Sequence, residues 1–290
     1  MTVQDGASPD GETSGELLAG GRTTPGVVRI GDTVHRPARR WTTTVHAVLR
    51  HLERAGFTEA PRVLGFDDQG REVLSYLEGE TVADRRPWPE WVSSDEALIQ
   101  VGSWLRRLHD ASVDFVPPED AVWFAGQRWR PGLVIGHQDA APYNAVWRQG
   151  RLVGFVDWDV AGPSSPEFDL AYTALMWVPL LAAGSAWPVA FGREDRYRRL
   201  HLLLDAYGYG EDRSVLQAAV GARARTNAEV TRRLADGGDP MFQALRDQSD
   251  DLDRSAQQVE DLPASFWCRP AADREPDGSS HPGGAPAPGQ

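Results

Sequence analysis

Three oxygen-bearing side chains stand at fixed spacing in the middle of the chain. Asp139 is followed five residues later by Asn144, and Asp157 comes thirteen residues after that. The segments 145–148 and 151–156 read as two strands of a hairpin, and folding it back brings Asn144 and Asp157 to the same end. Phosphoryl transfer requires a carboxylate that orients the attacking hydroxyl, and oxygen ligands that hold magnesium on the nucleotide phosphates. The pattern therefore predicts a phosphotransferase site built around this hairpin.

The residues around Asp139 agree with that interpretation. The apolar run 133–135, Leu-Val-Ile, is typical of a strand and delivers Asp139 to the strand end. Pro142 keeps the following loop from continuing as a helix. The spacing from Asp139 to Asn144 matches the catalytic loop of protein kinases, in which an Asp is followed by four residues and then by a magnesium-binding Asn.

The two motifs resemble those of the aminoglycoside phosphotransferase, or phosphotransferase-enzyme, family within the protein-kinase-like fold. That family's loop typically reads His-Gly-Asp-Leu-His-Pro-x-Asn before an Ile-Asp-Trp-Glu-like segment. Here 137–144 reads His-Gln-Asp-Ala-Ala-Pro-Tyr-Asn and 156–159 reads Val-Asp-Trp-Asp, and 161–171 is similar to the family's Gly-Asp-Pro-x-x-Asp-Leu-Ala stretch. The resemblance is specific between residues 136 and 171, and extends by general layout over 17–267. It implies an α+β, bilobal kinase-like fold with a small antiparallel β-sheet N-lobe and a mostly helical C-lobe.

The resemblance also implies a role for each matched residue. Asp139 would be the catalytic base or the group that orients the acceptor hydroxyl. Asn144 and Asp157 would bind Mg²⁺. Asp169, on the helix that follows, would buttress the catalytic loop, and His137 would orient that loop as a structural residue.

The chain contains no lysine, because all thirty of its Lys and Arg residues are arginine. The kinase fold ordinarily uses a lysine on its third strand, paired with a glutamate on the next helix, to hold the nucleotide phosphates. The segments 26–30 and 33–36 read as a hairpin that puts Arg36 near this position, and Arg29 is the next candidate. Glu53, in the last turn of the following helix, is the expected partner of Arg36. The alternative is an ordinary surface arginine and a solvated helix-end carboxylate.

The remaining nucleotide contacts are expected from a glycine pair and from the hinge between the lobes. Gly21 lies in a shortened glycine-rich stretch whose backbone amides can approach phosphate, although a glycine pair between strands is usually just a turn. Apolar strands at 62–66 and 72–77 complete a small sheet. If the fold is kinase-like, backbone groups near Tyr76 and Glu78 bind adenine at the hinge.

The second half of the chain is predicted to be mainly helical. Apolar residues at three- and four-residue spacing predict a helix over 94–109, and further helices are expected over 194–207, 212–236 and 239–260. Residues 171–192 carry no charge, which raises the question of a membrane span. The prolines and the glycine inside this run favour a buried helix followed by a loop.

In the family, such C-terminal helices form much of the wall that binds the acceptor. Asp159 is left open between a partner that orients the metal ligands and a solvated carboxylate. Trp177 and Trp267 are left open between stacking on a substrate ring and core packing. Solvated helix faces are the ordinary state of isolated carboxylates, and this alternative applies to each acidic candidate for an amine-bearing acceptor: Glu229, Asp247, Asp250, Asp251 and Asp253.

Length and composition narrow the organisation and the partners. A chain of 290 residues suits two lobes packed around a cleft, expected at 15–79 and 80–269, with polar ends at 1–14 and 270–290 expected to be disordered. The formal net charge of -12 argues against nucleic acid or an anionic membrane as a partner, and is compatible with a cationic substrate. One cysteine, Cys268, excludes an intrachain disulfide. Since no signal peptide is recognised, the cytoplasm is the expected compartment.

Together these patterns predict a magnesium-dependent enzyme that transfers the terminal phosphoryl group of ATP or GTP to a hydroxyl of a small molecule, such as an aminoglycoside or an amino-alcohol. The alternative is a non-catalytic nucleotide-binding module, which the missing lysine favours and the intact acidic set disfavours. A protein acceptor is disfavoured because no long peptide-docking or activation-loop insertion lies between Asp157 and Asp169, where the chain has only the short segment 160–168.

Overall fold

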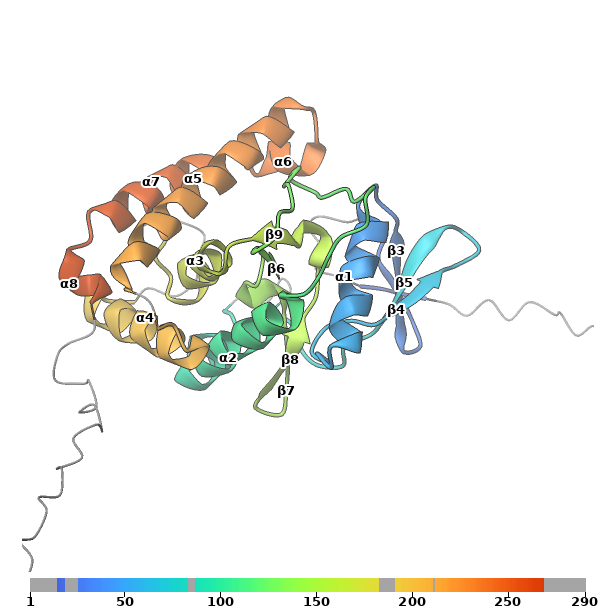
Figure 1. Ribbon diagram of the computed structural model, residues 1–290, viewed down its shortest axis with the longest axis horizontal. Coiled ribbons are helices and arrows are strands. Elements are labelled where there is room, and N and C mark those ends of the chain that lie inside the picture. Colours follow the sequence, from blue (N-terminus) through green and yellow to red (C-terminus); the bar gives the residue numbers. More distant parts are fainter. Residues whose placement is uncertain (1–14, 19–25, 83–86, 183–190, 211, 269–290) are drawn as a thin grey trace, which may run out of the picture.

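An antiparallel sheet with one helix forms the N-terminal part of the molecule, and most of the rest is helical (Figure 1). The computed structural model describes residues 15–18, 26–82, 87–182, 191–210 and 212–268. The predicted α+β arrangement, with a small antiparallel sheet and a helical portion, is confirmed. Gly21 and both ends expected to be disordered lie outside the described residues.

The sheet has the strand order β1-β2-β3-β5-β4, and every pairing in it is antiparallel. The pairing of β3 with β5 places Arg36 directly opposite Glu72, so their side chains emerge on the same face of the sheet. The strands are β1 (Glu16–Leu17), β2 (Val28–Ile30), β3 (Thr33–Pro37), β4 (Val63–Phe66) and β5 (Arg71–Ser75).

Helix α1 (Thr42–Arg54) lies against this sheet (Figure 1). Its apolar stripe of Val45, Val48, Leu49 and Leu52, at three- and four-residue spacing, is buried throughout. The helix ends before Gly56, whose φ of +80° is a left-handed conformation that favours glycine. The stripe and the glycine therefore fix both the buried face and the end of α1.

The helical part begins with α2 (Asp95–Ser112), which is capped by the Ser94 hydroxyl accepting from the Ala97 amide at 3.1 Å. The sequence prediction of one helix over 239–260 is wrong. The chain forms α6 (Pro240–Ala244) and then α7 (Gln248–Glu260), because the backbone hydrogen bonds between them run three residues back, from Arg246 to Gln243 and from Gln248 to Leu245, and interrupt the α-helical pattern. The Asp239 side chain caps α6 at the Met241 and Phe242 amides. The other helices are α3 (Pro166–Trp177), α4 (Arg193–Tyr207), α5 (Ser214–Asp236) and α8 (Ala264–Trp267).

A hairpin of β7 (Ala145–Arg148) and β8 (Arg151–Phe155) carries the candidate site and also contacts the hinge. Glu80 and Trp147 exchange two backbone hydrogen bonds of 2.8 Å. Gly79 has to be glycine here, because a Cβ would lie 2.8 Å from the Trp147 carbonyl oxygen. The chain leaving the sheet is thus paired directly with the hairpin.

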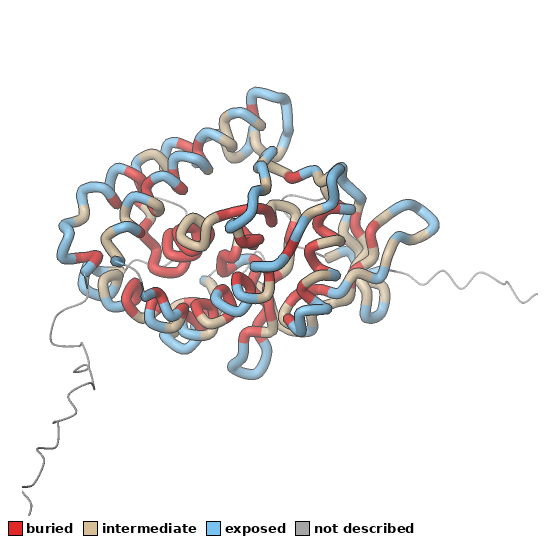
Figure 2. The backbone as a smooth tube through the Cα atoms, viewed as in Figure 1, coloured by how far each residue is buried: buried red, intermediate tan, exposed pale blue. Residues whose placement is uncertain are grey.

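The core is packed between the inner faces of the helices and the hairpin, where Figure 2 shows the buried residues gathered. The described part of the uncharged run 171–192 includes most of α3, which is buried from Asp169 to Trp177. Trp177 and Trp267 are both core residues, with 1% and 0% exposure, so neither is available to stack on a ligand. No helix in the described part of the chain has the length and apolar character needed to cross a membrane.

Two glycines inside helices differ in what surrounds them, which gives a matched test of the α2 and α4 packing. A Cβ on Gly102 would lie 2.7 Å from the Leu203 carbonyl oxygen, whereas the nearest atom to one on Gly221 is a side-chain oxygen of Glu260 at 3.4 Å. We expect Gly102→Ala to lower the free energy of unfolding by about 1–3 kcal/mol because α4 must shift. Gly221→Ala should be neutral or raise it by up to about 1 kcal/mol through helix propensity. Urea denaturation measures both, and equal effects would contradict this packing.

Candidate functional site

Asp139 follows β6 (Val134–Gly136) and is partly buried, with both carboxylate oxygens engaged. The Tyr143 hydroxyl donates to Oδ1 at 2.6 Å, and the Asn144 amide donates to Oδ2 at 2.8 Å. Tyr143 also hydrogen bonds to the Tyr172 hydroxyl at 2.8 Å. Burial raises the pKa of Asp139 to about 7, although the hydrogen bond from Tyr143 acts in the opposite direction. The carboxyl is thus held in one orientation and titrates near neutral pH.

Asn144 and Asp157 are brought together at one end of the hairpin, as the spacing predicted. The Val156 amide donates to the Asn144 carbonyl at 2.9 Å, so Asp157, the residue after Val156, lies at the same end of the hairpin as Asn144. Asn144 lies in η2 (Pro142–Asn144), a short 3-10 helix. Asp157 takes a left-handed backbone conformation with φ 64°, which is uncommon for a residue other than glycine and concentrates at functional sites.

The side chains at this end suit a magnesium ion. The Asn144 amide nitrogen donates to the Asp139 backbone and carboxylate oxygens, while its side-chain oxygen accepts no hydrogen bond from the described residues. Within the described ranges, no group of three or more His, Cys, Asp or Glu side chains is arranged to hold a metal ion alone. Mg²⁺ in nucleotide sites needs only one or two protein ligands, since phosphate and water supply the others.

Arg36 is buried in β3 among three carboxylates. Its Nε lies 2.8 Å from Glu72 and its Nη1 lies 3.5 Å from Asp157, while Nη2 pairs with Asp159. Asp159 also accepts a hydrogen bond from the Trp41 indole at 3.0 Å, so it is not a solvated carboxylate. Burial raises the pKa of Asp159, while the positive charge of Arg36 opposes that rise.

The expected pairing of Arg36 with Glu53 is not made. Glu53 is exposed, and the partner of Arg36 is Glu72, on the neighbouring strand. From α1 the residue that reaches Glu72 is His46, at 2.9 Å. Glu53 follows His46 by seven residues, or about 10 Å along the helix axis, so it lies on the same face but beyond the reach of Arg36.

The other residues expected to contact the nucleotide are engaged with other groups of the protein or line a cavity. The guanidinium of Arg29, the next candidate for the missing lysine, stacks on the Tyr76 ring, 3.8 Å from its centroid. Glu53 and Tyr76 line a cavity of about 400 Å³ beside the end of β5. The Glu78 carboxylate pairs with Arg148 at 2.5 Å, and the backbone amide and carbonyl of Glu78 make no hydrogen bond with the described residues.

His137 holds the catalytic loop from within the core. It is fully buried, its Nε2 lies 3.2 Å from the Val156 carbonyl, and its Nδ1 accepts from the Asp139 amide at 3.3 Å. Burial lowers the pKa of His137 to about 4, so the ring is neutral at physiological pH. This arrangement agrees with the structural role expected for His137, because both of its ring nitrogens contact the backbone.

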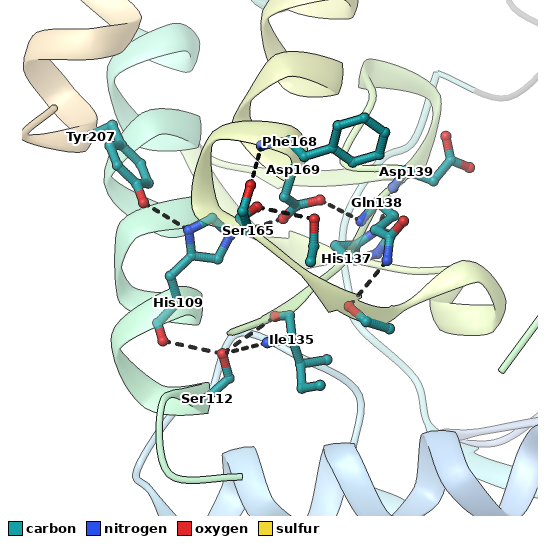
Figure 3. Close-up of polar contacts among 12 residues, drawn as sticks. His109, Ser112, Ile135, His137, Gln138, Asp139, Ser165, Phe168, Asp169 and Tyr207 are labelled. Carbon is teal, nitrogen blue, oxygen red and sulfur yellow. Dashed lines mark hydrogen bonds and ion pairs between the residues drawn. The ribbon is translucent and has the colours of Figure 1, made fainter. Parts of the chain in front are cut away.

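Asp169 lies within a buried chain of hydrogen bonds that runs from Tyr207 to Gln138, the residue before Asp139 (Figure 3). Tyr207 contacts His109 at 2.8 Å, His109 contacts Asp169 at 2.9 Å, and Asp169 accepts from the Gln138 amide at 2.7 Å. Burial acts to raise the pKa of Asp169, but the bond from His109 and the charge of Arg223 lower it below its ordinary value. The position of Asp169 therefore matches its expected buttressing role.

Several residues of the site were not found from the sequence. Gln138 has φ 62°, a conformation that favours glycine, and the family's loop typically has glycine at this position. That departure was a usable signal. Glu72, His46 and Arg223 gave none, because their partners come from other elements.

The acidic candidates for binding an amine are mostly paired already. Asp250 and Asp253 both accept from Arg232, at 2.7 and 2.6 Å, and Asp251 pairs with Arg254. Glu229 and Asp247 have no partner in the described part of the chain. The C-terminal helices therefore present no preformed cluster of unpaired carboxylates in the described ranges.

Comparison with known proteins places these features in a family. The model of the phosphotransferase enzyme family matches residues 19–132 and 121–213. A trifolitoxin immunity protein from Rhizobium leguminosarum bv. trifolii is 45% identical over 198 residues, which cover 66% of this chain and 73% of that protein.

Solved structures share the fold at low sequence identity. A choline/ethanolamine kinase family protein from Mesorhizobium loti superposes with a TM-score of 0.59 at 19% identity, covering 88% of this chain and 92% of that one. The amicoumacin kinase hAmiN, in complex with AMP-PNP, Ca²⁺ and Ami, gives a TM-score of 0.57 at 13% identity, covering 87% and 89%. The kinase-like fold expected from the motifs is confirmed, and the chain belongs to the phosphotransferase enzyme family.

Proposed function

We propose that this protein is a magnesium-dependent phosphotransferase that moves the terminal phosphoryl group of ATP or GTP to a hydroxyl of a small molecule. Family membership supports a small-molecule phosphotransferase in general. The observation that carries the specific proposal is the setting of Asp139, a partly buried carboxylate fixed by Tyr143 and by Asn144. A pure nucleotide binder has no need for such a group beside its metal ligands.

Each residue of the site has a distinct task in this reaction. The Asp139 carboxylate accepts a hydrogen bond from the acceptor hydroxyl and takes its proton as the oxygen attacks the terminal phosphorus. The bond from that phosphorus to the bridging oxygen breaks, and ADP or GDP leaves with the bond's electron pair. The side-chain oxygen of Asn144 and the carboxylate of Asp157 are the groups that would hold Mg²⁺. When bound, Mg²⁺ neutralises charge on the phosphate oxygens.

Arg36 is the proposed contact to the phosphates on the nucleotide side. In the structure its guanidinium serves Glu72, Asp157 and Asp159. A guanidinium presents a fork of N–H groups that fits phosphate oxygens as well as carboxylates. Arg36 can therefore keep its contact with Glu72 while the end of the fork turns from the two aspartates toward phosphate.

On the acceptor side, the Tyr143 hydroxyl is hydrogen bonded to Asp139. Tyr143 donates to Asp139 Oδ1 at 2.6 Å, and its side chain is 37% exposed. An acceptor hydroxyl must share this oxygen with Tyr143 or displace it. Aminoglycosides and amino-alcohols are the first acceptors to screen, since the family and the fold accommodate both classes.

The metal role of Asp157 can be tested by ligand-induced stabilisation. With ATP or GTP at about a hundredfold excess over Kd, linkage gives about 2.7 kcal/mol, or a rise in Tm on the order of 2–4 °C. We expect this rise to require Mg²⁺ and to be lost in Asp157→Ala, because the variant lacks one metal ligand. Asp253→Ala removes a carboxylate from a surface ion pair and should keep the full rise.

Differential scanning fluorimetry of the three proteins, with and without Mg²⁺, provides this measurement. A rise in Asp157→Ala equal to that of the wild type would contradict the assigned metal role. No rise in the wild type with either nucleotide would contradict a nucleotide site altogether.

The role of Asp139 separates catalysis from binding. We expect Asp139→Asn to reduce phosphoryl transfer by at least about 10²-fold, because an amide cannot accept the hydroxyl proton. The Mg²⁺-dependent rise in Tm with nucleotide should remain. ADP release and product mass measure transfer, and unchanged turnover in Asp139→Asn would rule out this role.

The similarity to a trifolitoxin immunity protein favours a biological role in resistance to a toxic compound, achieved by phosphorylating it. The wild type and Asp139→Asn, each expressed in a trifolitoxin-sensitive strain, test this role. Protection by the wild type and not by Asp139→Asn supports phosphoryl transfer as the means of protection. Equal protection by both would point to the non-catalytic alternative, in which binding alone is sufficient.

The Tyr143 hydrogen bond predicts a shift in pH dependence. That bond lowers the pKa of Asp139, which burial has raised to about 7. Its loss in Tyr143→Phe therefore raises the pKa further, and the acidic limb of kcat/KM, which reports the free enzyme, should move to higher pH. Tyr197→Phe is the control, because that hydroxyl bonds to the Cys268 carbonyl instead. A limb that stays in place or moves to lower pH would contradict the assignment.

A further inference from the structure

We infer that Arg223, on α5, is a positioning residue that fixes Asp139 through two separate routes. This inference rests on the proposed phosphotransferase function. Arg223 lies 79 residues beyond Asn144 in the sequence and is not part of any motif identified there. Its side chain is only 5% exposed, so it acts inside the protein and not as a contact to an acceptor in solution.

The first route passes through Gln138, the residue before Asp139. Arg223 Nη1 donates to the Gln138 side-chain oxygen at 3.1 Å, and Nη2 donates to the Gln138 backbone carbonyl at 2.6 Å. The Gln138 side-chain amide then donates to the Gly162 carbonyl at 3.1 Å, and its backbone amide donates to Asp169 (Figure 3). Gln138, the residue before Asp139, is thus held at its side chain, its backbone carbonyl and its backbone amide.

The conformation of Gln138 shows why such a clamp is needed. A non-glycine residue with φ near +60° carries a cost in backbone strain and persists only where its surroundings fix it. Glycine would remove that cost at this position. Here the residue is glutamine, and the Arg223 guanidinium donates to both its side-chain oxygen and its backbone oxygen. These two contacts link the turn to α5.

The second route passes through the two tyrosines. The Arg223 guanidinium lies 5.0 Å from the centroid of the Tyr172 ring and 4.8 Å from that of Phe168. Tyr172 bonds to Tyr143, and Tyr143 donates to Asp139. Arg223 therefore contacts both the backbone turn that aims Asp139 and the ring that supports its hydroxyl partner.

The state of the guanidinium itself points to this role. No carboxylate of the described residues lies within ion-pairing distance of Arg223, and its buried Nε has no hydrogen-bond partner among them. A charged group in such surroundings is costly to bury. Its retained contacts are those to Gln138, Tyr172 and Phe168, and these are the contacts that orient the catalytic loop.

The test uses MgATP with water as the acceptor, in which ATP and water give ADP and phosphate. We expect Arg223→Met to lower kcat on the order of 10- to 100-fold, because small displacements of a reacting group have effects of this size. KM for MgATP should change less than about threefold, and the MgATP-dependent rise in Tm should remain, since the nucleotide contacts lie elsewhere. Arg225→Met, on the same helix in an exposed pair with Glu260, should stay within about twofold of the wild type.

Two further variants separate positioning from charge and from folding. Arg223→Lys keeps the charge but lacks the fork, so its kcat should stay within about threefold of that of Arg223→Met. Gln138→Gly relieves the backbone strain, which offsets part of the cost of the side-chain hydrogen bonds lost to Arg223 and Gly162, so it should fold and show a lower kcat. Because Gln138 and Arg223 act together along the first route, the double variant Gln138→Gly with Arg223→Met should lose less than the product of the single losses.

The outcomes distinguish this inference from the proposed function. A wild type with neither ATP hydrolysis nor an MgATP-dependent rise in Tm overturns both. If the wild type is active and Arg223→Met has an unchanged kcat, the positioning role alone is overturned. Should Arg223→Met not fold, an unchanged kcat in Gln138→Gly overturns it in the same way. Full activity in Arg223→Lys would replace it with a role for charge only.

Discussion

The buried carboxylate of Asp169 fixes the backbone of the catalytic loop. It accepts from the Gln138 amide and from His109, which joins the loop to α3 and α2 at one point. Gly136 has no side chain for the same reason, since a Cβ there would lie 2.5 Å from the Asp169 carboxyl carbon. Loss of either partner would leave a buried charge or amide unsatisfied, at a cost of about 1–3 kcal/mol or more. The direction of Asp139, one residue further, depends on this junction (Figure 3).

On the nucleotide side, the absence of lysine is accompanied by a different set of partners. Each nitrogen of the Arg36 guanidinium faces a different carboxylate, with Nε toward Glu72, Nη1 toward Asp157 and Nη2 toward Asp159. A single ammonium has no fork to span three such groups. The glutamate also comes from the sheet and not from the helix, where His46 stands in the facing position. Arg36, Glu72 and His46 therefore form one connected set of contacts, and a lysine in place of Arg36 alone would not reproduce it.

The difference between what the sequence predicted and what it missed follows from the range of the interactions. Asp139, Asn144 and Asp157 were found because they lie on one loop and one hairpin, whose geometry is set by local spacing. The pairing of Arg36 depends on the register between β3 and β5, which no short segment specifies, so Glu53 was chosen and Glu72 was missed. Asp139, Asn144 and Asp157 are thus placed by local sequence, and their partners by tertiary packing.

Arg223 is an extreme case of the same limit, because it contacts Gln138 across 85 residues of sequence. No periodicity within α5 distinguishes it from the neighbouring arginines. The departure of Gln138 from the family's glycine was visible, but only the fold shows which side chain holds that glutamine. Positions that break a local rule are therefore useful guides to a site, even where the sequence does not reveal their partners.

The net charge of -12 says little about the acceptor once the charges are placed. Three of the acidic candidates on α7 are paired with Arg232 or Arg254, and the charge of α5 that lies nearest the catalytic loop is the positive one of Arg223. Exposed ion pairs contribute only about 0–1 kcal/mol, so a cationic acceptor is able to displace them, but it finds no preformed anionic pocket among the described residues. In the proposed reaction, an acceptor hydroxyl must share Asp139 Oδ1 with the Tyr143 hydroxyl or displace it. Under that proposal, selection among acceptors depends first on how well a hydroxyl competes with that phenol, and only then on charge.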